Sequence, residues 1–287
     1  MLTRKANAKI NLFLKITGKR EDGYHELDTI MQMVDFCDYI DMDLADDIEI
    51  AFSGMNVPEE NTVKAAVREF FAETGIKGGI KIHVTKNIPE KAGLGGSSVD
   101  AAEVLKGMNY LYESPLTLEQ LKKAAGKIGA DAPFGLTGGC CRARGIGETL
   151  ETVENNMNAY YLLLKPKRGI STPEAYAAYD RLPAYDEKLN IETCLKAMKE
   201  GNISDFGKYT GNSLEHAALH ICPETRAILK AFENSGVSAY VLSGSGSTCV
   251  GIFEHECDAK RIQQQLLNWD LDLNRIVRAI SPGGNLK

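Results

Sequence analysis

The sequence predicts an α+β protein of 287 residues that is divided into two domains. Strand-like and helix-like segments are mixed along the whole chain, without an internal repeat or a low-complexity tract. With 44% apolar and 25% charged residues, the chain can bury a substantial core. A polar run at 151–158 precedes an apolar segment, so we expect domains at 1–153 and 154–287.

In the first half, residues 8–16 alternate between apolar and polar side chains and predict a strand. Ala8, Ile10 and Leu12 share one parity, whereas Lys9 and Asn11 fall on the other, so these two polar side chains should share a face. Further short strands are expected at 48–52 and 80–84, and the apolar spacing of residues 61–75 predicts an amphipathic helix.

In the second half, the apolar run 160–164 predicts a strand. Helices are expected at 191–200, 223–235 and 258–268. Residues 237–242 and 248–253 predict a hairpin that is joined by the sequence SGSGS.

Charge and composition exclude several classes of function. The net charge of −6 comes from interspersed acids and bases, which argues against a nucleic-acid partner. No signal-peptide core and no apolar run of about 20 residues is present, so we expect a cytoplasmic protein without a membrane partner. Seven cysteines without a C-x-x-C pair indicate reduced thiols, and His216 and His220 lack the third ligand that a metal site needs.

The most informative segment is the glycine-rich run 89–102, PEKAGLGGSSVDAA, which leads from a loop into a helix. Gly93, Gly95 and Gly96 would let the backbone approach an anion, and the helix would direct its free N–H groups at it. Ser97 and Asp100 have the spacing of a capping box. Taken alone, a glycine-rich run of this kind is more often a flexible turn before an ordinary helix, and only the longer pattern favours a phosphate site.

Other nucleotide-binding loops do not fit this segment. The chain has no G-x-x-x-x-G-K-[ST] sequence, and G-x-G-x-x-G fails after Gly93 and again after Gly244. The catalytic-loop and D-F-G sequences of protein kinases are also absent.

The run P-x-x-x-G-L-G-x-S near residue 90 is similar to the phosphate-binding motif of GHMP kinases, and LSGSGST at 242–248 resembles their C-terminal glycine motif. AKINL at 8–12 followed by GYH at 23–25 resembles the 4-diphosphocytidyl-2-C-methyl-D-erythritol kinases within that superfamily. The resemblance continues through GADAPFGLTGG at 129–139, KPKRGISTPEAY at 165–176 and NSLE at 212–215, and so covers nearly the whole chain.

This resemblance implies an enzyme that transfers the γ-phosphoryl group of ATP to the 2-hydroxyl of 4-diphosphocytidyl-2-C-methyl-D-erythritol, a step in isoprenoid precursor biosynthesis. Lys9 and Asp131 would meet at the acceptor hydroxyl as the catalytic pair. Taken singly, Lys9 is better explained as a solvated charge on a strand and Asp131 as a turn or helix cap before Pro133; together with the glycine motifs, the catalytic interpretation is favoured. The ATP-binding residues implied are Pro89, Glu90, Lys91, Ala92, Gly93, Leu94, Gly95, Gly96, Ser97, Ser98 and Val99.

The second serine of the family motif is replaced here by Val99, so Ser98 is the candidate magnesium ligand, with Ser97 expected to serve as a cap. Tyr176 could be either a cytidine-stacking ring or a tyrosine packed on its own helix. The resemblance places it opposite the pair Tyr24 and His25, across the cytidine. The implied substrate-binding residues are Asn11, Tyr24, His25, Tyr176, Gly244, Ser245 and Gly246.

The implied fold has an N-terminal ATP-binding domain like domain 2 of ribosomal protein S5 and a ferredoxin-like C-terminal domain. The cofactors would be ATP and Mg²⁺, the partner a small-molecule substrate, and the oligomeric state a monomer or weak homodimer. Two alternatives stay open: another GHMP kinase, such as a mevalonate or homoserine kinase, or a ligand sensor without catalysis on the same fold.

Overall fold

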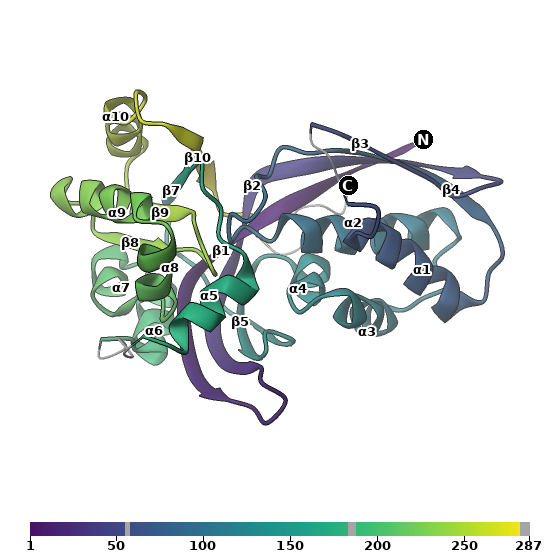
Figure 1. The fold of residues 1–287 in the computed structure, drawn as a ribbon, viewed down its shortest axis with the longest axis horizontal. Helices are drawn as coiled ribbons and strands as arrows, with labels where there is room; N and C mark the ends of the chain where they lie inside the picture. The colour runs from purple at the N-terminus through teal and green to yellow at the C-terminus, as the bar shows by residue number, and fades with distance from the viewer. Residues whose placement is uncertain (55–57, 183–187, 282–287) are drawn as a thin grey trace.

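The computed structural model describes residues 1–54, 58–182 and 188–281, which form two lobes side by side (Figure 1). A six-stranded sheet in the order β3-β4-β2-β5-β6, with β1 also paired to β2, builds the first lobe. Its strands are β1 Leu2–Lys19, β2 His25–Ala45, β3 Glu49–Ser53, β4 Gly79–Thr85, β5 Cys140–Gly145 and β6 Thr149–Thr152. The expected strands at 48–52 and 80–84 are therefore confirmed within a residue at either end.

Four helices cover one face of this sheet (Figure 1). The amphipathic segment forms α1 as expected, capped by the Asn61 side chain at its start and by Gly75, with a left-handed φ of 67°, at its end. The central helix α2 packs against α1, α3, α4 and the two long strands, and its side chains are mostly buried. The helices are α1 Thr62–Thr74, α2 Gly96–Leu111, α3 Leu118–Ile128 and α4 Ala132–Thr137.

The second lobe is an antiparallel sheet in the order β10-β7-β9-β8, packed with helices. In chain order this is 4-1-3-2, which is the expected ferredoxin-like topology. Three helices and the hairpin agree with the sequence prediction to within three residues. The strands are β7 Tyr160–Pro166, β8 Ala239–Leu242, β9 Cys249–Phe253 and β10 Leu271–Arg278; the helices are α5 Thr172–Tyr179, α6 Ile191–Glu200, α7 Ile203–Tyr209, α8 Glu215–Ile221, α9 Glu224–Asn234 and α10 Glu256–Gln265.

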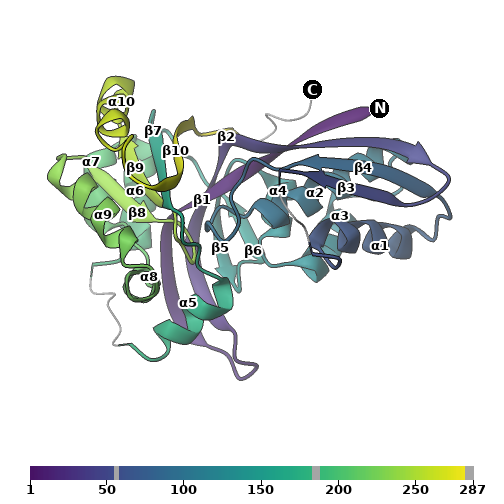
Figure 2. The same cartoon turned by 45° about the horizontal axis from the view of Figure 1, so that its top comes forward.

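The long β1/β2 hairpin belongs to the first sheet but also runs along the second lobe (Figures 1 and 2). Isolated bridges join Leu14 to Asn212 and Val34 to Ala279. The expected division after residue 153 falls between β6 and β7, in the chain segment that passes from one sheet to the other. The hairpin thus brings first-lobe residues against second-lobe loops.

The hairpin is also where the sequence prediction fell short. Residues 25–45 form a 21-residue strand that the alternation of side chains did not predict. Its middle, 29–34, is buried on both faces, so apolar residues follow one another there without a period of two. The strand expected at 8–16 is likewise part of a longer one.

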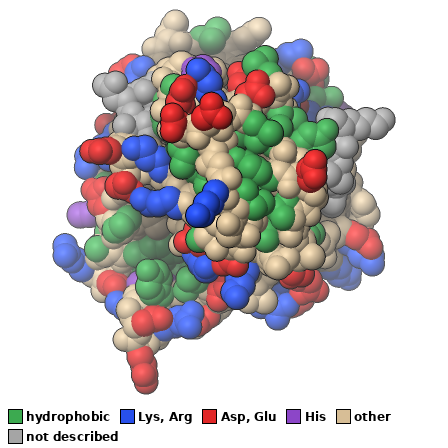
Figure 3. All heavy atoms as spheres, turned by 90° about the vertical axis from the view of Figure 1, so that its right-hand side faces the viewer, with side chains coloured by type: hydrophobic (Ala, Val, Ile, Leu, Met, Phe, Trp, Pro, Cys, Tyr) green, Lys and Arg blue, Asp and Glu red, His purple; other side chains and the backbone are tan. Residues whose placement is uncertain are grey.

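Over the face of the molecule in Figure 3, acidic and basic side chains are interspersed around a cluster of apolar ones. Such mixing gives no extended basic surface for a polyanion on that face. In the described ranges, no helix combines the length and the apolar character that crossing a bilayer requires.

Candidate active site

A cavity of about 1130 Å³ is lined by residues of both lobes. It collects most of the site residues that the sequence singled out, from segments far apart in the chain. Those lining it are Lys9, Asn11, Tyr24, His25, Pro89, Glu90, Lys91, Ala92, Gly93, Leu94, Gly95, Gly96, Ser97, Ser98, Asp131, Tyr176, Gly244 and Ser245. Val99 and Gly246 are not among the lining residues, and the Val99 side chain is buried in the first hydrophobic core.

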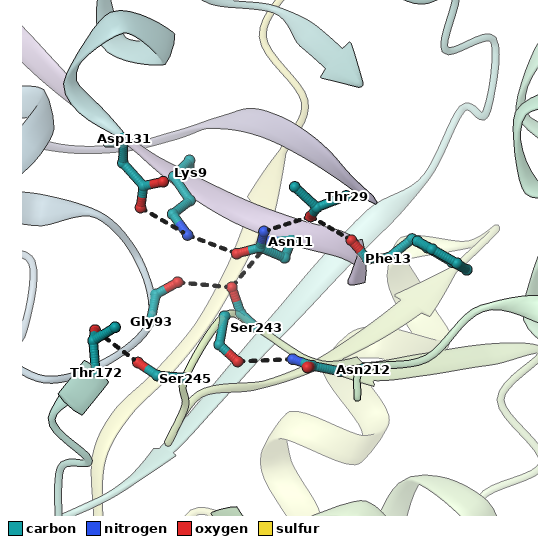
Figure 4. A network of polar contacts seen from close by, with 11 residues as sticks. Lys9, Asn11, Phe13, Thr29, Gly93, Asp131, Thr172, Asn212, Ser243 and Ser245 are labelled. Atoms are coloured by element: carbon teal, nitrogen blue, oxygen red, sulfur yellow. Dashed lines mark hydrogen bonds and ion pairs between the residues drawn. The ribbon is translucent and has the colours of Figure 1, made fainter. Parts of the chain in front are cut away.

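Lys9 and Asn11 lie on β1, and their side chains face the same way, as expected. The Lys9 ammonium donates to Asn11 Oδ1 at 2.6 Å and lies 3.3 Å from Asp131 Oδ2 (Figure 4). Lys9 is only 4% exposed, so it is not a solvated charge on an open strand. Its contacts with Asn11 and Asp131 keep the ammonium at one place in the cavity.

Asp131 occupies the N-cap position of α4, but its side chain makes no capping hydrogen bond. It pairs with Lys9 instead. Helix capping therefore does not account for this aspartate, and its carboxylate is directed at the cavity where Lys9 lies.

The glycine-rich run forms a loop that is tied to β1, because the backbone N–H of Lys9 donates to Leu94 O at 3.0 Å. Gly95 has a φ of 69°, and a Cβ placed on it would lie 2.9 Å from Lys9 Cγ. Gly93 has a φ of 74°, and a Cβ there would lie 2.0 Å from Ser243 O. Glycine is needed at both positions, because a side chain at residue 95 would collide with Lys9 and a side chain at residue 93 would collide with the backbone of the second glycine loop.

The two glycine-rich loops are held together by Ser243 (Figure 4). Its hydroxyl accepts from the backbone N–H of Asn11 at 3.0 Å and donates to Gly93 O at 2.8 Å. Asn212 donates to the carbonyls of Leu242 and Gly244, which fixes the loop on its other side. One hydroxyl thus connects β1, the first glycine loop and the second one.

Helix α2 begins at Gly96, directly after the first glycine loop, with Gly95 as its N-cap. The predicted capping box is wrong. The Ser97 side chain is exposed and makes no cap, and Asp100 is bound at 2.5 Å by the ammonium of Lys86. The helix starts two residues earlier than a capping box with Ser97 as N-cap would require. Within the described residues, its N-terminus has no side-chain cap.

Lys86 and Asp100 belong to a buried cluster with Asp38 under this helix. Asp38 also accepts from the backbone N–H groups of Asn87 and Ile88 at 2.5 and 2.8 Å. Burial raises the pKa of the Asp100 carboxyl to about 7, against the opposing effect of Lys86. Asp100 Oδ1 has no hydrogen-bond partner among the described residues, and Asp100 lines the cavity together with Ser98.

At the other end of the cavity, His25 and Tyr176 are stacked, with ring centroids 4.8 Å apart and an interplanar angle of 22°. Asp180 Oδ1 is hydrogen-bonded to His25 Nε2 at 2.8 Å, and Asp180 Oδ2 forms an ion pair with the Lys19 ammonium at 2.6 Å. Burial raises the pKa of the Tyr176 phenol above its usual value. Tyr24 is 61% exposed on the hairpin turn.

This arrangement corrects one expectation. Tyr176 does not face His25 across a space for a pyrimidine, because the two rings touch. Tyr24 and Tyr176 both line this end of the cavity, and Tyr176 also packs against the apolar cluster of Leu14, Ile16 and Leu214. The Tyr176 ring is therefore packed as well as cavity-lining, and its contact with a cytidine stays a prediction.

Sequence reasoning missed several residues that hold this site. Ser243 lies inside the recognised LSGSGST run, so its place beside the glycines was the available signal. Asp180 and Lys86 stand in no motif, and Thr29 lies in the N-terminal run without having been singled out. Thr29 accepts from Asn11 Nδ2 at 2.9 Å across the hairpin, a contact that depends on the β1/β2 register.

Comparison with known proteins agrees with this geometry. Residues 61–140 match the family description "GHMP kinases N terminal domain", and residues 194–269 match "GHMP kinases C terminal". A solved homoserine kinase from Cytophaga hutchinsonii has the same fold, with a TM-score of 0.78 over 99% of this chain and 96% of that chain at 18% identity. The chain therefore belongs to the GHMP kinases, whose phosphate donor is ATP.

A narrower group is also defined. A Caldicellulosiruptor bescii protein named 4-diphosphocytidyl-2-C-methyl-D-erythritol kinase is 38% identical over 91% of this chain and 93% of its own length. A crystal structure of 4-(cytidine 5'-diphospho)-2C-methyl-D-erythritol kinase matches 98% of this chain and all of that chain, with 30% identity and a TM-score of 0.80. Within the GHMP kinases, the chain belongs to the family of 4-diphosphocytidyl-2-C-methyl-D-erythritol kinases.

Proposed function

We propose that this protein transfers the γ-phosphoryl group of ATP to the 2-hydroxyl of 4-diphosphocytidyl-2-C-methyl-D-erythritol, giving the 2-phosphate and ADP, in isoprenoid precursor biosynthesis. The observation that carries the proposal is the Lys9–Asp131 pair in one cavity with the glycine loop at one end and the His25–Tyr176 stack at the other. Family membership supports the same substrate.

Phosphoryl transfer needs little covalent work from a protein, and depends on positioning and on stabilisation of charge. We assign Asp131 to the acceptor hydroxyl, whose proton it orients or accepts as the oxygen attacks the γ-phosphorus. The ammonium of Lys9, 3.3 Å away, stabilises the negative charge on that oxygen and on the transferring group. Asn11 keeps the ammonium in place through its hydrogen bond.

The residues 89–98 are proposed to bind the phosphates of ATP through backbone N–H groups at the start of α2. Two oxygen donors of this helix line the cavity, Ser98 and Asp100, and Asp100 Oδ1 has no partner among the described residues. Mg²⁺ commonly takes one or two protein oxygens and fills its other positions with phosphate and water. Ser98 is the proposed ligand, and the ion would neutralise phosphate charge.

At the acceptor end, Tyr24 and Tyr176 are proposed to contact the cytosine, and Gly244 and Ser245 the remainder of the acceptor. His25 is held by Asp180 and stacked on Tyr176, so its ring is fixed relative to the cavity. A fixed polar ring can discriminate cytosine from uracil by hydrogen bonding, whereas stacking alone tolerates any base.

The test is ADP release with three acceptors: the cytidine substrate, mevalonate and homoserine. We expect turnover with the cytidine compound alone. Turnover with mevalonate or homoserine at a comparable rate would show that the proposed acceptor is wrong, while the assignment as a kinase would stand. Absence of ADP release with every acceptor would favour a ligand sensor.

A further inference from the structure

A second cavity, of about 520 Å³, lies where β10 of the second lobe meets β1 and β2 of the first. We refer to it as the β10 cavity. It is lined by Lys5, Asn7, Asp35, Phe36, Cys37, Tyr39, Asn87, Arg275 and Ile280. None of these residues lines the active-site cavity, so the β10 cavity is a separate space.

An irregularity in the hairpin creates this cavity. Asn7 pairs with Cys37, whereas Lys9, two residues on, pairs with Met33, so β2 accommodates extra residues opposite β1. The bulged stretch carries Asp35 and Phe36, which line the β10 cavity. The strand β1 therefore contributes Asn7 to the β10 cavity and Lys9 to the active site.

Asn7 supplies the clearest sign of a missing partner. The residue is 3% exposed, and its Nδ2 has no hydrogen-bond partner in the described ranges. A buried amide N–H group without an acceptor is rare, because it loses its hydration without compensation. An acceptor held in the β10 cavity would satisfy it.

The charges of the β10 cavity favour an anion. Neither Lys5 nor Arg275 forms an ion pair with another residue of the described chain. The Arg275 guanidinium lies over the Phe36 ring, 4.8 Å from its centre, at the distance of a cation–π contact. The lining residues include two cations, Lys5 and Arg275, and one carboxylate, Asp35, whose Oδ1 accepts from the backbone N–H of Arg278 at 2.6 Å, so the positive charges exceed the negative one.

We propose that the β10 cavity binds the phosphate group of a small phosphorylated molecule, at a site distinct from the ATP site. Arg275 provides a planar fork that matches phosphate oxygens, Lys5 adds a second positive charge, and Asn7 donates a neutral hydrogen bond. The volume lies within the roughly 300–1,000 Å³ range of small-molecule sites.

Cys37 makes a local reporter for this site. It lines the β10 cavity and is half-buried, whereas Cys257 is exposed at the start of α10. The experiment measures the alkylation rates of both thiols with iodoacetamide by peptide mass spectrometry, while inorganic pyrophosphate is titrated in metal-free buffer. We expect pyrophosphate to slow the alkylation of Cys37 with saturation and to leave Cys257 unchanged.

Variants locate the ligand. Arg275→Gln and Lys5→Gln should each raise the pyrophosphate concentration for half-protection by at least ~10-fold, because each removes a charge-assisted contact. Arg68→Gln removes another exposed guanidinium, on α1, and should leave the titration unchanged. Melting temperatures confirm that each variant is folded.

Equal slowing of both cysteines, or no slowing of Cys37, would overturn the proposal. So would protection of Cys37 that persists unchanged in both Arg275→Gln and Lys5→Gln, because pyrophosphate would then act from the ATP loop. If succinate protects Cys37 at the same concentration as pyrophosphate, the site does not select phosphate and the proposal of a phosphate ligand is wrong.

Discussion

Lys9→Met should lower the turnover of the enzyme strongly while changing the stability of the fold only slightly. Methionine is similar in length, so it can fill the space beside Gly95, where Lys9 is 4% exposed. The ammonium is lost from a position 2.6 Å from Asn11 Oδ1 and 3.3 Å from Asp131 Oδ2. Charge stabilisation in the transition state disappears, while the packing of β1 is retained.

The expected loss of turnover is at least ~100-fold, the scale of one positioned charge-stabilising group, which corresponds to ~2.7 kcal/mol of activation free energy. The cost in stability is smaller. The charge-assisted hydrogen bond to Asn11, worth roughly 1.5–3 kcal/mol, and the pair with Asp131 are lost, but the desolvation of a buried ammonium is removed as well, so we expect a net cost of about 1 kcal/mol. A change of that size moves the melting temperature by about 2–4 °C in a chain of this order of length.

The assay is ADP release at saturating ATP and cytidine substrate, together with thermal unfolding of the same preparation. Lys15→Met is the matched control, because it makes the same chemical change on the same strand at a residue that does not line the cavity. The reasoning fails if Lys9→Met and Lys15→Met turn over within about threefold of each other at equal folding, since a positioned group should contribute at least ~100-fold.

Three further predictions follow from the same geometry. Gly95→Ala should lower kcat as well as raise the KM for ATP, because its Cβ would lie 2.9 Å from Lys9 Cγ; a change in KM alone would contradict that contact. Tyr176→Ala should weaken CDP binding by roughly 5- to 150-fold in calorimetry and spare ADP, the range for one lost stacking ring; equal weakening of both nucleotides would contradict a cytidine role. In the folded protein, burial raises the pKa of Asp100 to about 7 from the usual value of 3.8, so the wild type should lose stability as the pH rises from 4 to 7. Asp100→Asn has no proton to release, so its melting temperature should rise relative to that of the wild type across this window. Parallel melting profiles of the two proteins would contradict this prediction.

The sequence by itself determined the elements whose signals are local. Helix α1 is bounded by Asn61 and Gly75, a side-chain cap and a left-handed glycine that short-range geometry requires. The glycine runs at 93–96 and 244–246 were recognisable because close backbone approach leaves no substitute for glycine. The motifs also fixed the superfamily and the candidate pair Lys9 and Asp131.

Only the tertiary structure decided which groups meet. The strand β2 had no alternation to read, because its central residues are buried on both faces. Ser97 was expected to cap α2, yet the start of the helix is set by Gly95, while Asp100 is bound by Lys86 from the end of β4. These outcomes depend on long-range contacts that no short window of sequence contains.

The aromatic end of the site makes the same distinction. His25 and Tyr176 were both singled out, but their direct stacking and the contact of His25 with Asp180 join residues about 150 positions apart. Sequence specified the residue types that can stack and hydrogen-bond. The packing of α5 against the β1/β2 hairpin decided the distances between them, because side-chain contacts at such separation follow from the arrangement of whole elements.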